Sequence, residues 1–402
     1  MAIKKQFIVG GLLLIAFLLA GCGDGDGELG PVGPAGPPGP QGPAGPPGDP
    51  ASAAADYVGS ETCAGCHEDI YIHFVQSGHA FKLNPVVDGQ PPEYPFSQVP
   101  NPPDGYTWGD VSYVIGGYNW KALFIDSEGY IITGDENAAT QYNLENTMLG
   151  MGGDWVPYYA GEEKPYACGN CHTTSYRPVG NQDGLSGLIG TWAEPGIKCE
   201  ECHGPGGYHI MNPYRVHMKI VRDAESCSQC HSRGAEEEVD ASGGFISHHE
   251  QYEELYQSKH LILDCVDCHD PHSGVVQLRK TDQPTVRTTC DSCHFKEARY
   301  STVKIHTSFA ECIDCHMPRV TRSALGDANS FTGDLRTHVM AIDPFQIGQF
   351  SADGSISLPQ ISLDFACRHC HVNGTGTEKP DEVLIQAADG YHNPPPPPSG
   401  EE

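Results

Sequence analysis

Sixteen of the seventeen cysteines stand in eight copies of one motif, Cys-x-x-Cys-His. The two thiols of a copy lie about one helical turn apart, so they can form thioethers with both vinyl groups of one haem while the adjacent imidazole binds its iron. Zinc sites and a disulfide framework are the alternative uses of so many cysteines, but neither requires a histidine after every pair. The attachment cysteines are Cys63, Cys66, Cys168, Cys171, Cys199, Cys202, Cys227, Cys230, Cys265, Cys268, Cys290, Cys293, Cys312, Cys315, Cys367 and Cys370. The proximal iron ligands are His67, His172, His203, His231, His269, His294, His316 and His371. The sequence therefore predicts eight covalently bound haem c groups, numbered here by motif.

The remaining histidines can supply the sixth iron ligands. Of the 20 histidines, 12 are not proximal ligands, whereas the chain has only 7 methionines. Bis-histidine ligation keeps haem potentials lower than histidine and methionine ligation does. The predicted distal ligands are His79, His209, His217, His249 (with His248 as the alternative), His260, His272, His306 and His338. His73, His369 and His392 are left over as surface residues, and the sequence does not assign each distal ligand to its haem.

The N-terminus predicts export and lipidation. Lys4 and Lys5 precede an apolar run, residues 7–20, which is typical of a signal peptide and short for a membrane span. The run ends in Leu-Ala-Gly-Cys at residues 19–22, which resembles the bacterial lipoprotein box. The alternative is a chance cysteine in an ordinary cleavage site. We expect a signal peptide over residues 1–21 and a lipidated Cys22 that anchors the protein in the outer membrane.

A collagen-like segment follows the anchor. Glycine recurs at every third position over residues 30–50, with proline after most of the glycines. A polyproline II spacer of about 60 Å satisfies this pattern, and a short triple helix that makes a homotrimer is the alternative. We assign residues 22–56 to the anchor and spacer, and residues 394–402 to a stiff proline-rich tail.

The charge balance restricts the partners. The chain carries 52 Asp and Glu but only 23 Lys and Arg, a formal net charge of −29. Nucleic acid is excluded as a natural partner because phosphate backbones require a basic surface. A surface with this excess of negative charge attracts cationic partners such as basic cytochromes and metal ions. The alternative interpretation is a solvated acidic surface without a specific partner.

Motif spacing predicts the architecture. Motifs 2 to 7 crowd into residues 161–320, where there is room for short helices and loops around touching haems, whereas motif 8 belongs to residues 321–393. Residues 57–160 hold motif 1 and β-branched or aromatic runs near 111–115, 120–125 and 130–133, which predict a hairpin or small meander. Its role is to pack over haems 1 and 2, or alternatively to dock a partner. We expect a mainly α fold with extensive loops around stacked haems and this small β segment.

Several stretches resemble one superfamily of multihaem cytochromes. The stretch from Val58 to Cys63 leading to Ser77-Gly78-His79, CHGPGGYH at 202–209, CHDPH at 268–272 and CHMP at 315–318 are similar to elements of hydroxylamine oxidoreductase and octahaem tetrathionate reductase. This resemblance covers most of residues 57–345 and implies a mainly helical fold of stacked, mostly bis-His haems. It makes distal roles for His79, His209, His272 and His338 more credible. The chain departs from the reductases in having no Cys-x-x-Cys-Lys motif.

These observations favour electron transfer. An enzyme needs one iron with an open coordination position, whereas twelve spare histidines could close every iron. We expect a lipid-anchored cytochrome, similar to outer-surface cytochromes, that serves redox proteins such as cytochromes and quinol-linked donors, or extracellular metal acceptors. An oxidoreductase for hydroxylamine, nitrite or tetrathionate, and a subunit of a haem filament, are the alternatives. No residue group suggests catalysis without haem.

Overall fold

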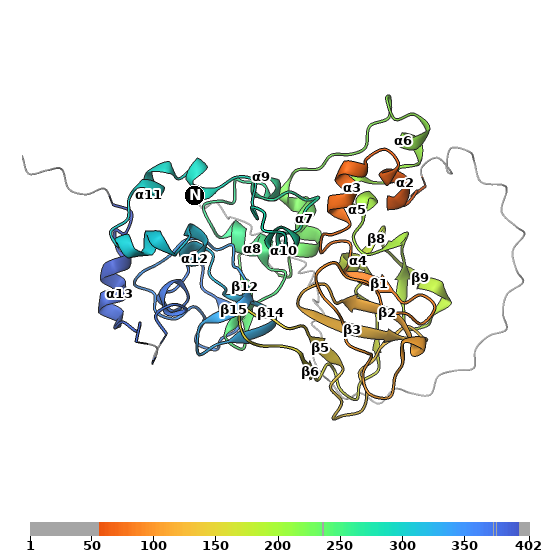
Figure 1. Ribbon diagram of the computed structural model, residues 1–402, viewed down its shortest axis with the longest axis horizontal. Coiled ribbons are helices and arrows are strands. Elements are labelled where there is room, and N and C mark those ends of the chain that lie inside the picture. The colour runs from red at the N-terminus through yellow and green to blue at the C-terminus, as the bar shows by residue number, and fades with distance from the viewer. Residues whose placement is uncertain (1–55, 235–236, 373, 375, 394–402) are drawn as a thin grey trace, which may run out of the picture. The chain divides into compact units, whose positions relative to one another are not determined.

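The Cys-x-x-Cys-His motifs fall on or beside short helices, most of which are labelled in Figure 1. The computed structural model describes residues 56–234, 237–372, 374 and 376–393. The predicted signal peptide, Cys22, the collagen-like segment and the proline-rich tail lie outside these residues. The motif helices are α2 (Ser60–Ala64), α4 (Gly169–His172), α5 (Cys199–His203), α7 (Ala224–His231), α9 (Cys265–Cys268), η3 (Cys290–Ser292), α12 (Cys312–His316) and η5 (Asp364–Arg368).

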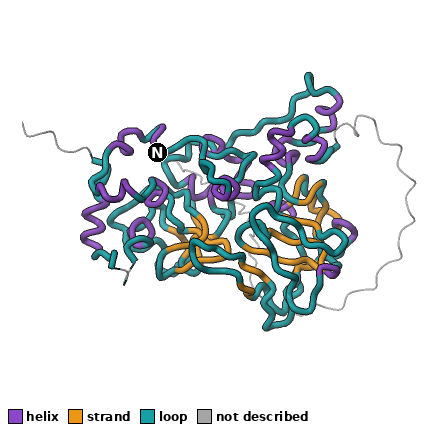
Figure 2. The backbone as a smooth tube through the Cα atoms, in the orientation of Figure 1, coloured by secondary structure: helices purple, strands orange, loops and turns teal. Residues whose placement is uncertain are grey.

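The motif itself explains these short helices. In motifs 1, 5, 6 and 8 the N–H of the histidine donates to the carbonyl of the first cysteine, at 2.8 to 3.0 Å. This bond closes one helical turn and places both thiols and the imidazole on the same turn. Figure 2 shows that the helices are short and separated by long loops. The remaining helices are α3 (Glu68–Phe74), η1 (Trp108–Asp110), η2 (Gln182–Gly184), α6 (Gly207–Met211), α8 (Gln251–Tyr256), α10 (Val275–Lys280), α11 (Phe295–Arg299), η4 (Lys304–Ser308) and α13 (Asp381–Ala388).

The gap between motifs 1 and 2 folds into a sheet of seven strands. The predicted hairpin is present as β2 (Val111–Gly116) and β3 (Lys121–Asp126), paired antiparallel with Val114 opposite Phe124. The path β1-β2-β3-β4-β7 is extended by β5 on β3 and by β6 on β5. The other strands are β1 (Leu83–Pro85), β4 (Tyr130–Ile131), β5 (Gln141–Asn143), β6 (Asp154–Val156) and β7 (Lys164–Pro165).

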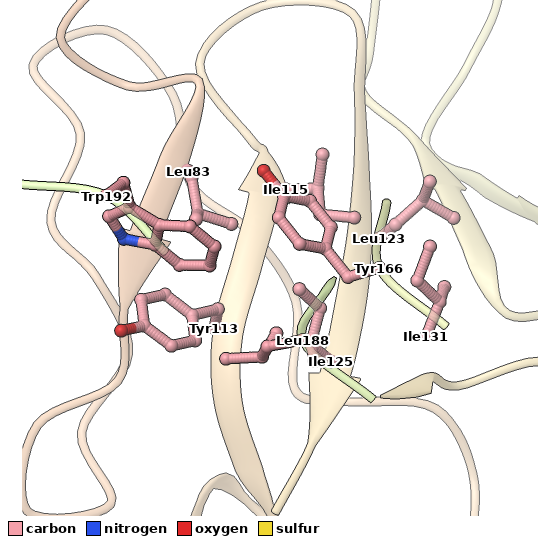
Figure 3. Close-up of a cluster of buried hydrophobic side chains, with 9 residues drawn as sticks. All are labelled: Leu83, Tyr113, Ile115, Leu123, Ile125, Ile131, Tyr166, Leu188 and Trp192. Carbon is pink, nitrogen blue, oxygen red and sulfur yellow. The ribbon is translucent and has the colours of Figure 1, made fainter. Parts of the chain in front are cut away.

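Both faces of this sheet are covered. Tyr113 and Ile115 of β2 point into one apolar cluster, which Tyr166 and Trp192 complete from later in the chain (Figure 3). Val114 of β2 belongs to a second cluster, with Phe124 and Ile132, on the opposite face. Strands buried on both faces have continuous apolar runs rather than alternating ones, which is the pattern of residues 113–115 and 122–125.

A second sheet of five strands lies among the later motifs. Its order is β15-β14-β13-β12-β16, and β13 and β14 pair in parallel. Its strands are β12 (Val239–Ser242), β13 (Phe245–Ser247), β14 (Thr321–Asp327), β15 (Thr332–Leu335) and β16 (Ile356–Ser357), and two small pairs join β8 (Thr173–Thr174) to β11 (Glu194–Pro195) and β9 (Arg177–Asn181) to β10 (Ile189–Thr191). The expected mainly α fold is therefore not confirmed. Helices are limited to about one turn per motif, and the loops between motifs pair into sheets.

Buried carboxylates fasten loops that are distant in sequence. Glu200, in motif 3, accepts hydrogen bonds from the backbone N–H groups of Val58 (3.0 Å), Gly59 (2.9 Å) and Gly206 (2.7 Å). The segment before motif 1 is thereby fixed against motif 3. A hydrogen bond to a charged group contributes about 1.5 to 3 kcal/mol, so Glu200 orders both segments strongly.

Glu254 has the same role in the second half. Its carboxylate accepts from the hydroxyls of Thr321 (3.1 Å) and Thr337 (3.0 Å) and from the backbone N–H of His338. Helix α8, strand β14 and the loop before His338 are therefore held by one fully buried group. Among the described residues, the structure contains no helix with the length and apolar character needed to cross a bilayer.

Candidate haem and electron-transfer site

Seven of the eight proximal histidines face a second imidazole at nearly the same spacing. In a bis-histidine haem, two iron–nitrogen bonds of about 2 Å and two half-rings place the imidazole centroids about 6.3 Å apart. The observed separations range from 5.7 to 6.3 Å. The pairs are His67 with His209, His231 with His79, His203 with His272, His294 with His260, His269 with His338, His316 with His392, and His371 with His306. Each pair thus fits one haem between its rings.

Hydrogen bonds to Nδ1 orient several of these rings. His203 donates from Nδ1 to the carbonyl of Lys219 (2.7 Å), and His209 donates to the carbonyl of Val216 (2.6 Å). His316 donates likewise to the carbonyl of Met340 (2.9 Å). Iron-binding imidazoles usually donate their other N–H in this way, which leaves Nε2 free for the metal.

Burial keeps key imidazoles in the metal-binding form. Burial lowers the pKa of His79 to about 3, and it lowers the pKa of His269 to about 4, with the His338 and His231 charges acting in the same direction. Both rings are therefore neutral near pH 7, and the neutral ring is the one that binds a metal.

Six of the eight predicted distal histidines lie opposite a proximal one: His79, His209, His260, His272, His306 and His338. Within the described part of the chain, His217 is exposed and is not found at ligand spacing from any motif histidine. His392, expected from the sequence to be a surface residue, instead lies 6.0 Å from His316. It comes from the C-terminal end, and its Nδ1 donates to the carbonyls of Glu297 (2.9 Å) and Tyr300 (3.0 Å). No local signal marked it, because its partner lies 76 residues earlier in the chain.

Motif 2 differs from the other seven. Among the described residues, His172 is the one proximal histidine for which no imidazole is found at the bis-histidine spacing. His249 lies 6.0 Å from His231, which already faces His79, and stacks on His248 at 4.2 Å. His249, predicted as a distal ligand, is therefore not found opposite a proximal histidine that lacks another imidazole partner.

The surroundings of motif 2 are rich in cations. Burial, followed by the charges of Lys121 and Arg233, lowers the pKa of His248 to about 3, and burial also lowers the pKa values of Lys82 and Lys121. The backbone carbonyl of Lys82 accepts from His172 Nδ1 (3.1 Å), and Lys121 Nζ donates to the carbonyl of Ser323 (2.8 Å). The two lysines and Arg233 form a positive environment around motif 2.

Apolar side chains around the motifs are exposed where a haem would cover them. Tyr214 is 93% exposed, Ile262 is 83% exposed and Phe295 is 65% exposed, although all three lie within motif-bearing segments. A soluble protein rarely leaves such side chains uncovered without a partner surface. The porphyrin is that surface in a c-type cytochrome, so the apolar lining fits the same groups as the histidines.

The motif cysteines lie near one another in a continuous order. Interacting cysteine pairs join motif 1 to 3 (Cys63 and Cys199), 3 to 4 (Cys202 and Cys227), 4 to 5 (Cys227 and Cys265), 5 to 6 (Cys268 and Cys293), 6 to 7 (Cys290 and Cys312) and 7 to 8 (Cys315 and Cys367). Cys171 and Cys230 are hydrogen bonded and attach motif 2 to motif 4 as a branch. Each thiol is consumed when it becomes a thioether, so these pairings report only which attachment sites are neighbours.

Comparison with known proteins gives the same class. Residues 151–204, around motifs 2 and 3, match the family model described as cytochrome c554 and c-prime. The chain is 26% identical over 166 residues to the multihaem cytochrome MtrA of Shewanella baltica, covering 38% of this chain and 45% of the relative. It is 26% identical over 187 residues to the dissimilatory sulfite reductase MccA of Wolinella succinogenes, covering 37% of this chain and 26% of that one. The chain thus spans less than half the length of either relative.

A solved structure shares the fold. The octahaem sulfite reductase MccA of Wolinella succinogenes superposes with a TM-score of 0.56 at 17% identity, over 82% of this chain and 69% of that one. This likeness concerns the fold alone. Together with the repeated motif and its paired histidines, these findings identify the chain as a multihaem c-type cytochrome.

Proposed function

We propose that the chain is a lipid-anchored octahaem c-type cytochrome that passes electrons between membrane or periplasmic donors and acceptors at the cell surface. The observation that carries this proposal is the set of seven imidazole pairs at bis-histidine spacing, strung along neighbouring motifs. Closed iron sites favour electron transfer over substrate binding, and close neighbours favour rapid hopping.

The chain's residues have three tasks in this function. When bound, the haems supply reversible one-electron chemistry, and the eight cysteine pairs fix their positions. The paired histidines would keep the irons low-spin and the haem reduction potentials low. Backbone carbonyls orient the imidazole rings. The acidic surface attracts cationic redox partners. Basic cytochromes, quinol-linked donors and extracellular metal acceptors are the partner classes that we propose.

The direct test is spectroscopic. Electron paramagnetic resonance of the oxidised protein, with a pyridine haemochrome count, should give eight haems that are low-spin except for the one at motif 2. Carbon monoxide binding to the reduced protein should then involve at most that haem. Several high-spin irons would contradict a chain of closed sites, and a count below eight would contradict the octahaem assignment.

The anchor has its own test. Cys22→Ser removes the residue that we propose is lipidated, so the mature protein should move from the membrane fraction to the soluble fraction while its haem content stays the same. The matched control is Gly23→Ser, next to the lipidated position. Persistent membrane attachment of a Cys22 variant from which the signal peptide has been removed would rule out lipid anchoring.

The environment of motif 2 favours a second candidate, an oxidoreductase that acts on a small oxyanion. His172 faces no imidazole at ligand spacing among the described residues, and Lys121 and Arg233 would favour a negatively charged ligand there. A carbon monoxide complex, together with turnover of hydroxylamine, nitrite or tetrathionate, would support this reading. Loss of both in a Lys121→Met variant that keeps its haem content would locate the activity at motif 2.

A further inference from the structure

Motif 6 is the least covered of the eight motifs. Both of its cysteines, Cys290 and Cys293, are exposed, and so is His294. Every other motif in the described chain has at least one cysteine that is partly buried. All eight motifs would attach the same kind of group, so the exposure of their cysteines can be compared directly. The polypeptide therefore covers motif 6 less than it covers any other motif.

Apolar side chains frame this open motif. Ile305 is 67% exposed and Phe309 is 66% exposed, and they lie on or beside η4. An exposed apolar centre next to an exposed redox group is the usual composition of a transient electron-exchange surface.

The charge of this region is opposite to that of the chain. Residues 275–311 contain six Lys and Arg against four Asp and Glu, whereas residues 224–274 contain two against eleven and residues 312–393 contain five against ten. Lys296, Arg299 and Lys304 are exposed, and within the described part of the chain none of them forms an ion pair. We call these three residues the motif 6 patch.

One other basic segment must be compared with this patch. Residues 202–222 contain Arg215, Lys219 and Arg222 and no acidic residue. Motif 3, beside them, is more covered, because its Cys199 is partly buried whereas both cysteines of motif 6 are exposed. Only at motif 6 do an open motif, exposed apolar residues and excess positive charge coincide in the described chain.

We propose that the motif 6 patch is where the protein delivers electrons to small anionic acceptors, such as ferric carboxylate chelates. This inference rests on the proposed electron-transfer function and adds the exit site and the acceptor class. One electron leaves the protein and reduces the ferric ion of the chelate to ferrous. No bond forms or breaks in the protein, and the donor of the proposed function replaces the electron.

Electrostatic range explains why the acceptor is small. Charges are screened beyond about 8 Å at physiological ionic strength. A small anion at the patch therefore interacts with Lys296, Arg299 and Lys304, whereas an acidic protein would also face the strongly negative flanking regions. The motif 6 patch thus favours acceptors that are small enough to interact with these three cations and not with the negative regions beside them.

Charge reversal tests the proposal on the full-length holoprotein. The patch variant is Lys296→Glu/Arg299→Glu/Lys304→Glu, and the matched control is Arg215→Glu/Lys219→Glu/Arg222→Glu, which changes the net charge equally. Stopped-flow oxidation of the reduced protein by ferric citrate should slow about tenfold in the patch variant at low ionic strength, with the difference shrinking as salt is added. The control should change less than about twofold, and a neutral quinone should oxidise all three proteins equally.

A binding measurement separates this proposal from the proposed function. Gallium citrate carries the same charge as the ferric chelate but accepts no electron, so calorimetry should detect its low-salt binding to wild type and control but not to the patch variant. Equal slowing of both variants, stronger slowing of the control, or gallium citrate binding that the patch variant retains would overturn the assignment. Failure of every acceptor to oxidise wild type would instead contradict electron transfer, while the gallium titration would still test the surface.

Discussion

The histidines show how single residues acquire their role through position. Burial holds His79 and His269 neutral, and backbone carbonyls at His203 and His209 take up the second ring nitrogen. An imidazole in this state is a poor proton carrier at pH 7 but a good iron ligand. The pairing geometry therefore argues for structural ligands rather than for acid–base groups.

Replacing His392 tests this argument at one motif. His392→Ala should open the iron at motif 7, because His316 would lose the ring that now lies 6.0 Å away. We expect one additional high-spin signal in the oxidised protein and one additional carbon monoxide site on reduction. The control is His217→Ala, an exposed histidine that should leave both spectra unchanged. Identical spectra for wild type and His392→Ala would remove His392 from the ligand set.

The sequence predicted ligand residues better than ligand pairs. Attachment cysteines and proximal histidines follow from local spacing, because one helical turn is a local structure. Distal ligands come from anywhere in the fold. His338 faces His269 across 69 positions, and His392 could not be told from a surface residue because no adjacent motif marks it. The distal assignments themselves stay predictions until the spectra are recorded.

At the scale of elements, the hairpin of β2 and β3 positions the region between motifs 1 and 2. Gly116 ends β2 with a φ of 72°, and a Cβ there would lie 2.6 Å from the carbonyl oxygen of Lys121. Glycine is required twice over at this turn, for its backbone conformation and for the close approach of β3.

Gly116→Ala should therefore destabilise the protein by about 1 to 3 kcal/mol, as measured by the shift of its guanidinium unfolding transition. Gly105→Ala is the matched control, since Gly105 also has a positive φ (91°) but nothing lies within 4 Å of its would-be Cβ. The control should lose only about 1 kcal/mol, from backbone strain alone. Equal losses at both positions would mean that the contact with Lys121 carries no weight.

In the second half of the chain, Glu254 holds helix α8, strand β14 and the loop before His338 together. Glu254→Gln keeps the size of the side chain but removes the negative charge that strengthens the bonds from Thr321, Thr337 and His338, and one of these partners must then face a donating NH₂ group. We expect the free energy of unfolding to fall by about 3 kcal/mol. Glu238→Gln, at an exposed position, should leave stability nearly unchanged, and a comparable loss there would argue against a specific role for Glu254.

The two sheets mark where sequence patterns stop being informative. The β2 and β3 hairpin was predicted because its strands are adjacent and rich in β-branched residues. The parallel pair of β13 and β14 joins Ile246 to Thr321, which are far apart in sequence, so no local periodicity announces it. A fold built from one-turn helices and distant loop pairings cannot be read from helix and strand patterns alone.

At the scale of the whole molecule, the motifs form a branched chain with motif 4 at the junction. Its helix α7 contacts α4 of motif 2, α9 of motif 5 and the connecting helix α8. Motif 8 lies at one end, and among the other motif helices η5 makes its principal contact with α12 of motif 7. The polypeptide between motifs has short elements, so neighbouring attachments are expected to stabilise each other.

This arrangement predicts unequal effects of removing a haem. Cys367→Ala/Cys370→Ala should give a folded protein with one haem fewer, because only the end of the chain loses its packing. Cys227→Ala/Cys230→Ala should prevent maturation or yield a protein that unfolds far more easily, because three neighbouring motifs lose a shared surface. The measurements are the haemochrome content and the unfolding midpoint of each purified variant. If the two variants mature and unfold alike, the haems act as independent attachments and the junction at motif 4 has no structural meaning.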